Sequence, residues 1–150
     1  MGEILRSSPA LKEQGIFQEY PVSRVNPSYR DNSHKFDWVI LNLRVVIECH
    51  GIQHYSVQTF GMSTEDAIDS FRAQQRRDKS KKQAALDAGW KYIEIPYKLE
   101  KSLSEATILK MIEETEWGEE VVAPPTLHQK QLEKQRAYNR EMYRRMRQSK

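Results

Sequence analysis

Residues 36–54, which read FDWVILNLRVVIECHGIQH, contain two apolar runs separated by a short polar break. Both runs are rich in valine and isoleucine, which favour strands, and Asn42 between them suits a tight turn. The second run, VVIEC, is apolar at successive positions, which is typical of a strand covered on both faces. We therefore predict a hairpin made of strands at residues 35–41 and 44–49.

Polar residues stand near the ends of these two predicted strands. Asp37 lies near the start of the first, and Glu48 and His50 lie at the end of the second. Because alternate residues of a strand share a face, Glu48 and His50 are expected to point the same way, and hairpin pairing would bring Asp37 to them. Two carboxylates, an imidazole and the Cys49 carbonyl oxygen would then surround one point. Hard divalent cations such as Mg²⁺ prefer oxygen ligands, and such a metal ion can activate water against a phosphodiester.

The composition predicts one domain with an appendage. The chain has 150 residues, of which 38% are hydrophobic and 30% charged, and its net charge is +3. Residues 127–150 hold eight Lys/Arg and two Glu, so residues 1–126 carry a net charge of −3. A basic tail on a mildly acidic body favours contact with nucleic acid.

The single cysteine, Cys49, excludes an intramolecular disulfide and a cysteine-rich zinc site, and it suits a reducing compartment. The sequence has no run of about 18 apolar residues and no apolar signal-peptide core. We therefore expect an intracellular, cytoplasmic protein that makes no use of a membrane.

The remaining elements follow from capping and turn signals. Ser8, Pro9 and Gly15 predict a short helix at 9–14, with a possible extra turn at 3–6. Pro21 places the next strand, 16–24, at a sheet edge. The other predicted elements are a helix from Ser63 or Thr64 to about 88, a strand at 90–97, and a helix from Ser102 or Ser104 to about 116. The long helix allows a crossover that places the last strand beside the third and parallel to it.

Several short motifs occur in a recognisable order. They are IECHGIQHY at 47–55, Phe60-Gly61, and RRDKSKKQAALDAGWKYIEIPY at 76–97. Together they resemble the Vsr-like (EDxHD) branch of the PD-(D/E)XK nucleases, which includes very-short-patch repair and phage or intron homing endonucleases. The resemblance covers about residues 3–116. It implies an α/β fold, a restriction-endonuclease-like α/β/α core with a mixed sheet, in a nuclease domain at 1–118. The sequence pattern outside the resemblance predicts a linker at 119–126, with Pro124 and Pro125, and a basic helical tail at 127–150.

The resemblance also implies roles for individual residues. Asp37, Glu48 and the Cys49 carbonyl would bind Mg²⁺ or Mn²⁺. The catalytic residues would be Asp37, Glu48, His50, His54 and Asp78, with His50 in the place where the wider pattern has Lys. A glutamate of the N-terminal helix is also expected, and both Glu3 and Glu13 are candidates.

Each assignment has a structural alternative. Glu48 could pair with Arg44 or Lys35, and His54 could contact phosphate or cap its loop. Asp78 could form a plain salt bridge on the helix surface, which contributes little. Lys82, one turn on, could pair with Asp78 or bind phosphate. Gln53 is a weaker site candidate, whereas a core position is expected for Trp90, Ile93 and Ile95.

The tail at 127–147 predicts a basic helix. Its arginines recur at helical spacing, and we expect nucleic-acid contact from Arg136, Arg140, Arg144, Arg145 and Arg147. A second stripe, made of Tyr138, Met142 and Met146, could instead dock on a partner chain, and both could hold.

Taken together, the residues and the resemblance favour a magnesium-dependent endonuclease that cuts DNA. One site per chain predicts nicking, and a homodimer would allow double-strand cleavage. Two other hypotheses stay open: a non-catalytic nucleic-acid-binding module on a nuclease fold, and an interaction protein whose tail pairs with itself or with another chain.

Overall fold

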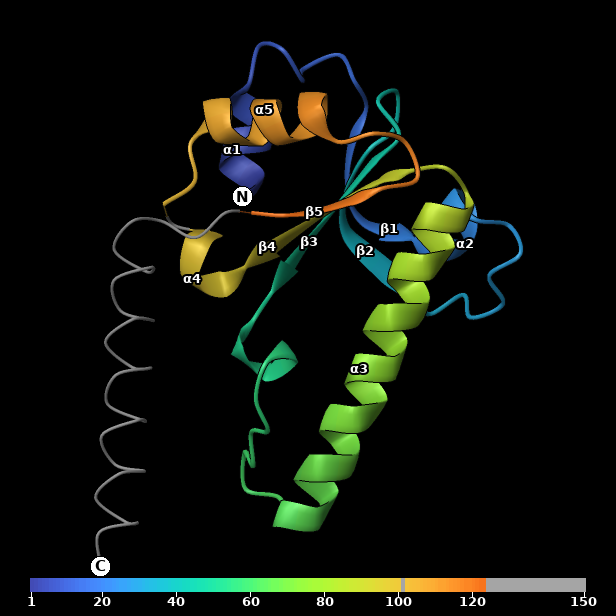
Figure 1. The fold of residues 1–150 in the computed structure, drawn as a ribbon, viewed down its shortest axis with the longest axis vertical. Helices are drawn as coiled ribbons and strands as arrows, with labels where there is room; N and C mark the ends of the chain where they lie inside the picture. The colour runs from blue at the N-terminus through green and yellow to red at the C-terminus, as the bar shows by residue number, and fades with distance from the viewer. Residues whose placement is uncertain (101, 124–150) are drawn as a thin grey trace, which may run out of the picture.

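A computed structural model describes residues 1–100 and 102–123. They form an α/β protein in which helices lie on both faces of one mixed sheet (Figure 1). The strands are β1 (Ile16–Pro21), β2 (Lys35–Ile40), β3 (Val45–His50), β4 (Lys91–Pro96) and β5 (Glu120–Val122). The helices are α1 (Gly2–Ser7), α2 (Val22–Val25), α3 (Thr64–Asp87), α4 (Tyr97–Glu100) and α5 (Glu105–Glu114), with a 3₁₀ turn η1 (Ile52–His54).

The strands lie in the sheet in chain order, from β1 to β5. β2 pairs with β1 and with β3 in antiparallel fashion, so the predicted hairpin is confirmed, with Trp38 opposite Ile47. β4 pairs with β3 in parallel, as the predicted crossover requires, and β5 pairs in parallel with β4. Pro21 ends β1 at the edge of the sheet, where its missing N–H interrupts no inner ladder.

Separate apolar cores cover the two faces of the sheet. On one face, Leu5 from α1 and Ile108 from α5 pack in the same core as Ile47. On the other face, Ala85 from α3 packs with Val46. The three residues predicted for the core are all buried: Trp90, Ile93 and Ile95.

The long predicted helix is confirmed as α3. The Ser63 hydroxyl accepts a hydrogen bond from the Asp66 amide at its N-terminus, and Gly89 follows its end with a φ of +74°. Only the later turns of α3 cover the sheet, through Ala84 and Ala85, and its first turns extend past the sheet (Figure 1). Across the described part of the chain, neither α3 nor any other helix combines the length and apolar character needed to cross a bilayer.

Three local predictions were wrong. The strand predicted at 16–24 ends at Pro21, and Val22–Val25 form the helix α2, because Val22 and Val25, three residues apart, both pack into the core. The segment at 9–14 makes turns rather than a helix, because the amides of Leu11 and Lys12 both bond to the Ser8 carbonyl and Gly15 follows too soon. The helix is α1, which the sequence indicated only as an extra turn. The expected linker at 119–126 begins inside the sheet, since β5 hydrogen-bonds to β4. β5 follows Gly118 and Glu119, and its three residues, EVV, form too short an apolar pattern to be identified as a strand from the sequence.

Candidate functional site

The candidate site lies at the carboxyl ends of β3 and β4, on the face that α3 covers. Val46 and Tyr92 are register partners in the core beneath α3. Because side chains alternate along a strand, Glu48, His50 and Glu94 point to that same face, as predicted for Glu48 and His50. η1 continues from β3 and contacts α3. The carboxyl ends of parallel strands are a common place for ligand sites.

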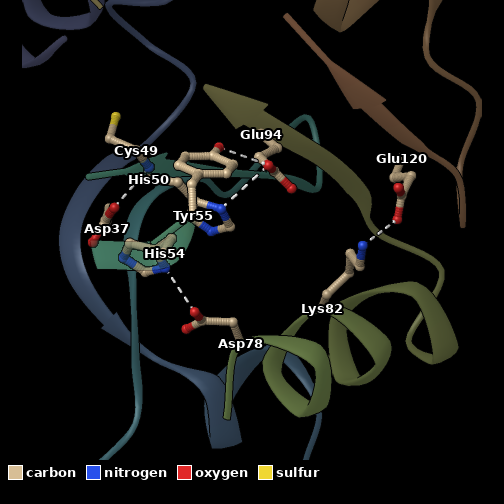
Figure 2. A network of polar contacts seen from close by, with 9 residues as sticks. All are labelled: Asp37, Cys49, His50, His54, Tyr55, Asp78, Lys82, Glu94 and Glu120. Carbon is tan, nitrogen blue, oxygen red and sulfur yellow. Dashed lines mark hydrogen bonds and ion pairs between the residues drawn. The ribbon is translucent and has the colours of Figure 1, made fainter. Parts of the chain in front are cut away.

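Asp37 and Cys49 are brought together where β2 and β3 diverge. Asp37 Oδ2 accepts a hydrogen bond of 2.7 Å from the Cys49 amide (Figure 2). Since the N–H and C=O of one strand residue face the same neighbouring strand, the Cys49 carbonyl is also directed toward the β2 side. Asp37 Oδ1 has no hydrogen bond or ion pair within residues 1–100 and 102–123.

His50 is buried, with 7% of its surface exposed, and it contacts Glu94. His50 Nδ1 lies 3.3 Å from Glu94 Oε1, and the Tyr55 hydroxyl donates a 3.0 Å hydrogen bond to the same oxygen (Figure 2). Burial alone would lower the pKa of His50, but the hydrogen bond and charge of Glu94 outweigh burial and raise that pKa. The hydrogen bond from His50 in turn lowers the pKa of Glu94, against the opposing effect of burial.

Burial raises the pKa of the Tyr55 phenol, and the charge of Glu94 adds to the effect. Tyr55 therefore stays protonated and remains a donor to Glu94. The Glu94 carboxylate therefore contacts two groups, the Tyr55 hydroxyl and His50 Nδ1. The contact with Glu94 holds Nδ1 of His50 toward β4 and leaves Nε2 available.

His54 forms a second imidazole–carboxylate pair with α3. Its Nδ1 lies 2.6 Å from Asp78 Oδ2 (Figure 2). Burial would raise the pKa of Asp78, but the hydrogen bond and charge of His54 lower it below its ordinary value. The His54 ring stacks on the His50 ring, with centroids 4.3 Å apart and planes 2° from parallel. An ionised carboxylate only accepts, so each ring donates from Nδ1 and presents Nε2 for other chemistry.

Glu48 makes an ion pair with Lys81 of α3 rather than joining Asp37. Lys81 Nζ lies 2.7 Å from Glu48 Oε1, and only 3% of Glu48 and 9% of Lys81 are exposed. The contact is not aligned as a hydrogen bond, so Oε1 has an ionic partner but no directed donor. Burial raises the pKa of Glu48 to about 7, although the charge of Lys81 opposes that rise. The ammonium also lies 5.5 Å from the centre of the Phe36 ring.

The two histidines open into a cleft between α3 and β4. The cleft has a volume of about 420 Å³ and is bordered by His50, His54, Tyr55, Asp78, Lys79, Lys82 and Glu94, among others. Lys82 forms a 2.9 Å ion pair with Glu120 of β5 across the opening (Figure 2). Lys82 therefore pairs with β5 and not with Asp78.

The donor set fits a divalent metal ion in part. No group of three or more His, Cys, Asp or Glu side chains close enough to hold a metal ion occurs within the described ranges. Mg²⁺ often takes only one or two protein carboxylates together with water and substrate oxygens. Asp37, with its unengaged Oδ1, and the Cys49 carbonyl fit this smaller set, whereas Glu48 is already neutralised by Lys81.

The structure places the predicted site residues in three groups. His50, His54 and Asp78 share the cleft, Asp37 and Cys49 share a hydrogen bond, and Glu48 pairs with Lys81. Both helix candidates, Glu3 and Glu13, are exposed and border no part of the cleft. Gln53 is exposed in η1. The five tail arginines lie outside the described residues.

Sequence reasoning missed Tyr55, Lys81 and Glu94. Glu94 carried a usable signal, because a carboxylate inside the apolar strand sequence YIEIP needs a partner when it is buried. Lys81 follows Asp78 by three residues, which places both on adjacent parts of one helix face. Only the strand register could show which groups these residues would meet.

A scan against protein-family models and a search of curated proteins found no match to this chain.

Proposed function

We propose that this chain is a metal-dependent endonuclease that hydrolyses phosphodiester bonds of DNA, on a Vsr-like variant of the restriction-endonuclease fold. The mixed sheet with α1 and α5 on one face and α3 on the other is compatible with that fold. The observation that carries the proposal is the stacked pair His50 and His54, each held by its own carboxylate at the mouth of a cleft.

The two imidazoles suit the two proton transfers of hydrolysis. His54, oriented by Asp78, accepts the proton of the attacking water through Nε2. The water oxygen forms the new bond to phosphorus as the bond to the leaving oxygen breaks. His50, whose raised pKa favours the imidazolium, donates its Nε2 proton to that leaving oxygen. Both protons are thereby accounted for, and the histidines exchange charge states during one turnover.

Asp37 and the Cys49 carbonyl would hold Mg²⁺ or Mn²⁺, which supplies Lewis-acid polarisation of the phosphate when it is bound. Asp37 suits this role because the hydrogen bond from the Cys49 amide fixes Oδ2 and leaves Oδ1 without a partner among the described residues. Glu48 forms an ion pair with Lys81, so its carboxylate is not counted among the metal ligands.

The proposal is tested by nicking of supercoiled plasmid DNA by the full-length chain. Open circles should form with Mg²⁺ or Mn²⁺ and should not form with EDTA. Glu13→Ala is a suitable control, because it removes an exposed carboxylate outside the cleft and should cut like the wild type. Binding without cleavage under every metal condition would instead support a non-catalytic nucleic-acid-binding module.

A further inference from the structure

A second groove lies along an adjacent side of α3, next to the histidine cleft. Its volume is about 510 Å³. The polar residues that border it are Asn26, Ser28 and Tyr29 from the segment after α2, and Arg76, Lys79, Ser80, Gln83 and Asp87 from α3. The proposed hydrolysis assigns no role to the residues of this groove.

The two grooves meet across one turn of α3. Lys79 and Gln83 are four residues apart, and both border the histidine cleft as well as the second groove. A linear ligand that leaves the histidine cleft over this turn therefore enters the second groove directly.

The second groove is lined by more positive than negative charge. Arg76 and Lys79 against the single carboxylate of Asp87 give its lining a net charge of +1, within a body of net charge −3. Arg76 and Lys79 are exposed and make no ion pair within the described part of the chain. The one carboxylate bordering the groove, Asp87, accepts a 2.7 Å hydrogen bond from Gln83. The Ser28 and Ser80 hydroxyls have no hydrogen-bond partner among the described residues and can donate to phosphate oxygens.

We propose that the second groove binds backbone phosphates of a nucleic-acid strand, next to the phosphate that the histidine cleft holds. The inference rests on the proposed function and adds the path of its substrate across α3. A nucleic acid fits better than an acidic peptide, because the strand must continue from a phosphodiester site and because phosphates recur along it at regular intervals. Arg76 and Lys79, three residues apart on one helix face, match such a series with two cations.

The test measures binding of a labelled DNA duplex to the full-length chain. Fluorescence anisotropy reports the affinity in EDTA across a series of salt concentrations. The variant is Arg76→Gln/Lys79→Gln. The matched control is Lys12→Gln/Lys110→Gln, which removes the same charge from exposed positions in the turns after α1 and on α5. Each lost phosphate contact should lower the log–log salt slope by about 0.9, so the groove variant should lose up to about 1.8. The control should keep the wild-type slope.

Equal slopes for the groove variant and the control would overturn the inference. So would equal competition by polyglutamate and by DNA of the same charge, since that result indicates a surface for acidic peptides. If the wild-type protein bound no DNA at all, the proposed function would be contradicted together with this inference. Binding is measured without metal or cleavage, so a failure of the catalytic assignment leaves this result interpretable.

Discussion

The parallel rings of His50 and His54 have centroids 4.3 Å apart, and each ring has its own carboxylate partner. Glu94 contacts His50 Nδ1, and Asp78 contacts His54 Nδ1. The two rings therefore present their Nε2 atoms from neighbouring, fixed positions. Two titratable groups held in different environments are a general way to obtain an acid and a base in one site.

If the histidines divide the acid and base roles, removing either should be severe. We expect His50→Ala and His54→Ala each to lower the cleavage rate by roughly 10²–10⁴-fold, the range for a lost general acid or base. Single-turnover cleavage measures this directly. His34→Ala is the control, because His34 contacts Tyr29 and Asp31 outside the cleft. If either His50→Ala or His54→Ala cleaved DNA at the wild-type rate, the assignment of the two histidines as acid and base would be contradicted.

The buried pair Glu48–Lys81 predicts a pH-dependent stability effect. The raised pKa of Glu48 means that its contribution to stability is full below its unfolded pKa of about 4.5 and is lost as pH rises through about 7. Lys81→Met removes the opposing cation, so it should destabilise the protein more at pH 8 than at pH 5.

Urea unfolding at both pH values measures this effect. At pH 8 the loss should be of order 3–5 kcal/mol, which is typical of a broken buried pair. The double variant Glu48→Gln/Lys81→Met should recover most of it, since no buried charge is left. If the double variant were as unstable as Lys81→Met, then packing of the lysine stem and not its charge would explain the loss.

Asp78 predicts the opposite direction of pH dependence. Its pKa is lowered, so it stabilises the protein above its unfolded pKa of about 3.8, and this contribution is lost as pH falls through the folded pKa. Asp78→Asn should therefore lower the free energy of unfolding at pH 7 and have little effect near pH 2. Asp69→Asn, at a side chain that is 73% exposed, provides the comparison and should change stability little at either pH. A constant difference between Asp78→Asn and wild type at all pH values would refute the linkage.

At the scale of elements, the helices and strands that could be predicted from the sequence are those with long apolar patterns. The hairpin β2–β3, the helix α3 and the strand β4 all have such patterns together with clear caps. The elements that could not be predicted are α2, α4 and β5, which have three or four residues each and form because tertiary partners hold them. The site divides in the same way: the shared face of Glu48 and His50 follows from strand alternation, whereas the contacts His50–Glu94 and Glu48–Lys81 depend on strand register and on helix placement.

The segment at 127–150 differs in charge from the rest of the chain, because it has eight Lys/Arg and two Glu. Its removal should weaken DNA binding and flatten the salt dependence, because each neutralised phosphate contributes about 0.9 to the slope. The measurement is anisotropy across a salt series for full-length and truncated protein. An unchanged slope would exclude the tail as a phosphate-binding element. A dimer that became a monomer on truncation, seen by light scattering, would assign the tail to self-association through Tyr138, Met142 and Met146.

At the scale of the whole molecule, successive elements of the fold bring the candidate site residues together. β2 and β3 diverge to offer Asp37 and Cys49, β3 continues into His50 and η1, and α3 returns across the site with Asp78 and Lys81. The same helix borders both the histidine cleft and the second groove, which meet at Lys79 and Gln83. One such site per chain predicts open circles rather than linear molecules as the first plasmid product.

The most direct test of the central claim is plasmid nicking by Asp37→Ala beside the wild type, with the DNA affinity and thermal unfolding of both proteins measured in parallel. Asp37 supplies one carboxylate to the proposed metal site and only one hydrogen bond to the fold. The variant should therefore lose cleavage while it folds and binds DNA nearly as the wild type does. Nicking by Asp37→Ala within a few-fold of the wild-type rate would contradict the assignment of the metal-dependent site.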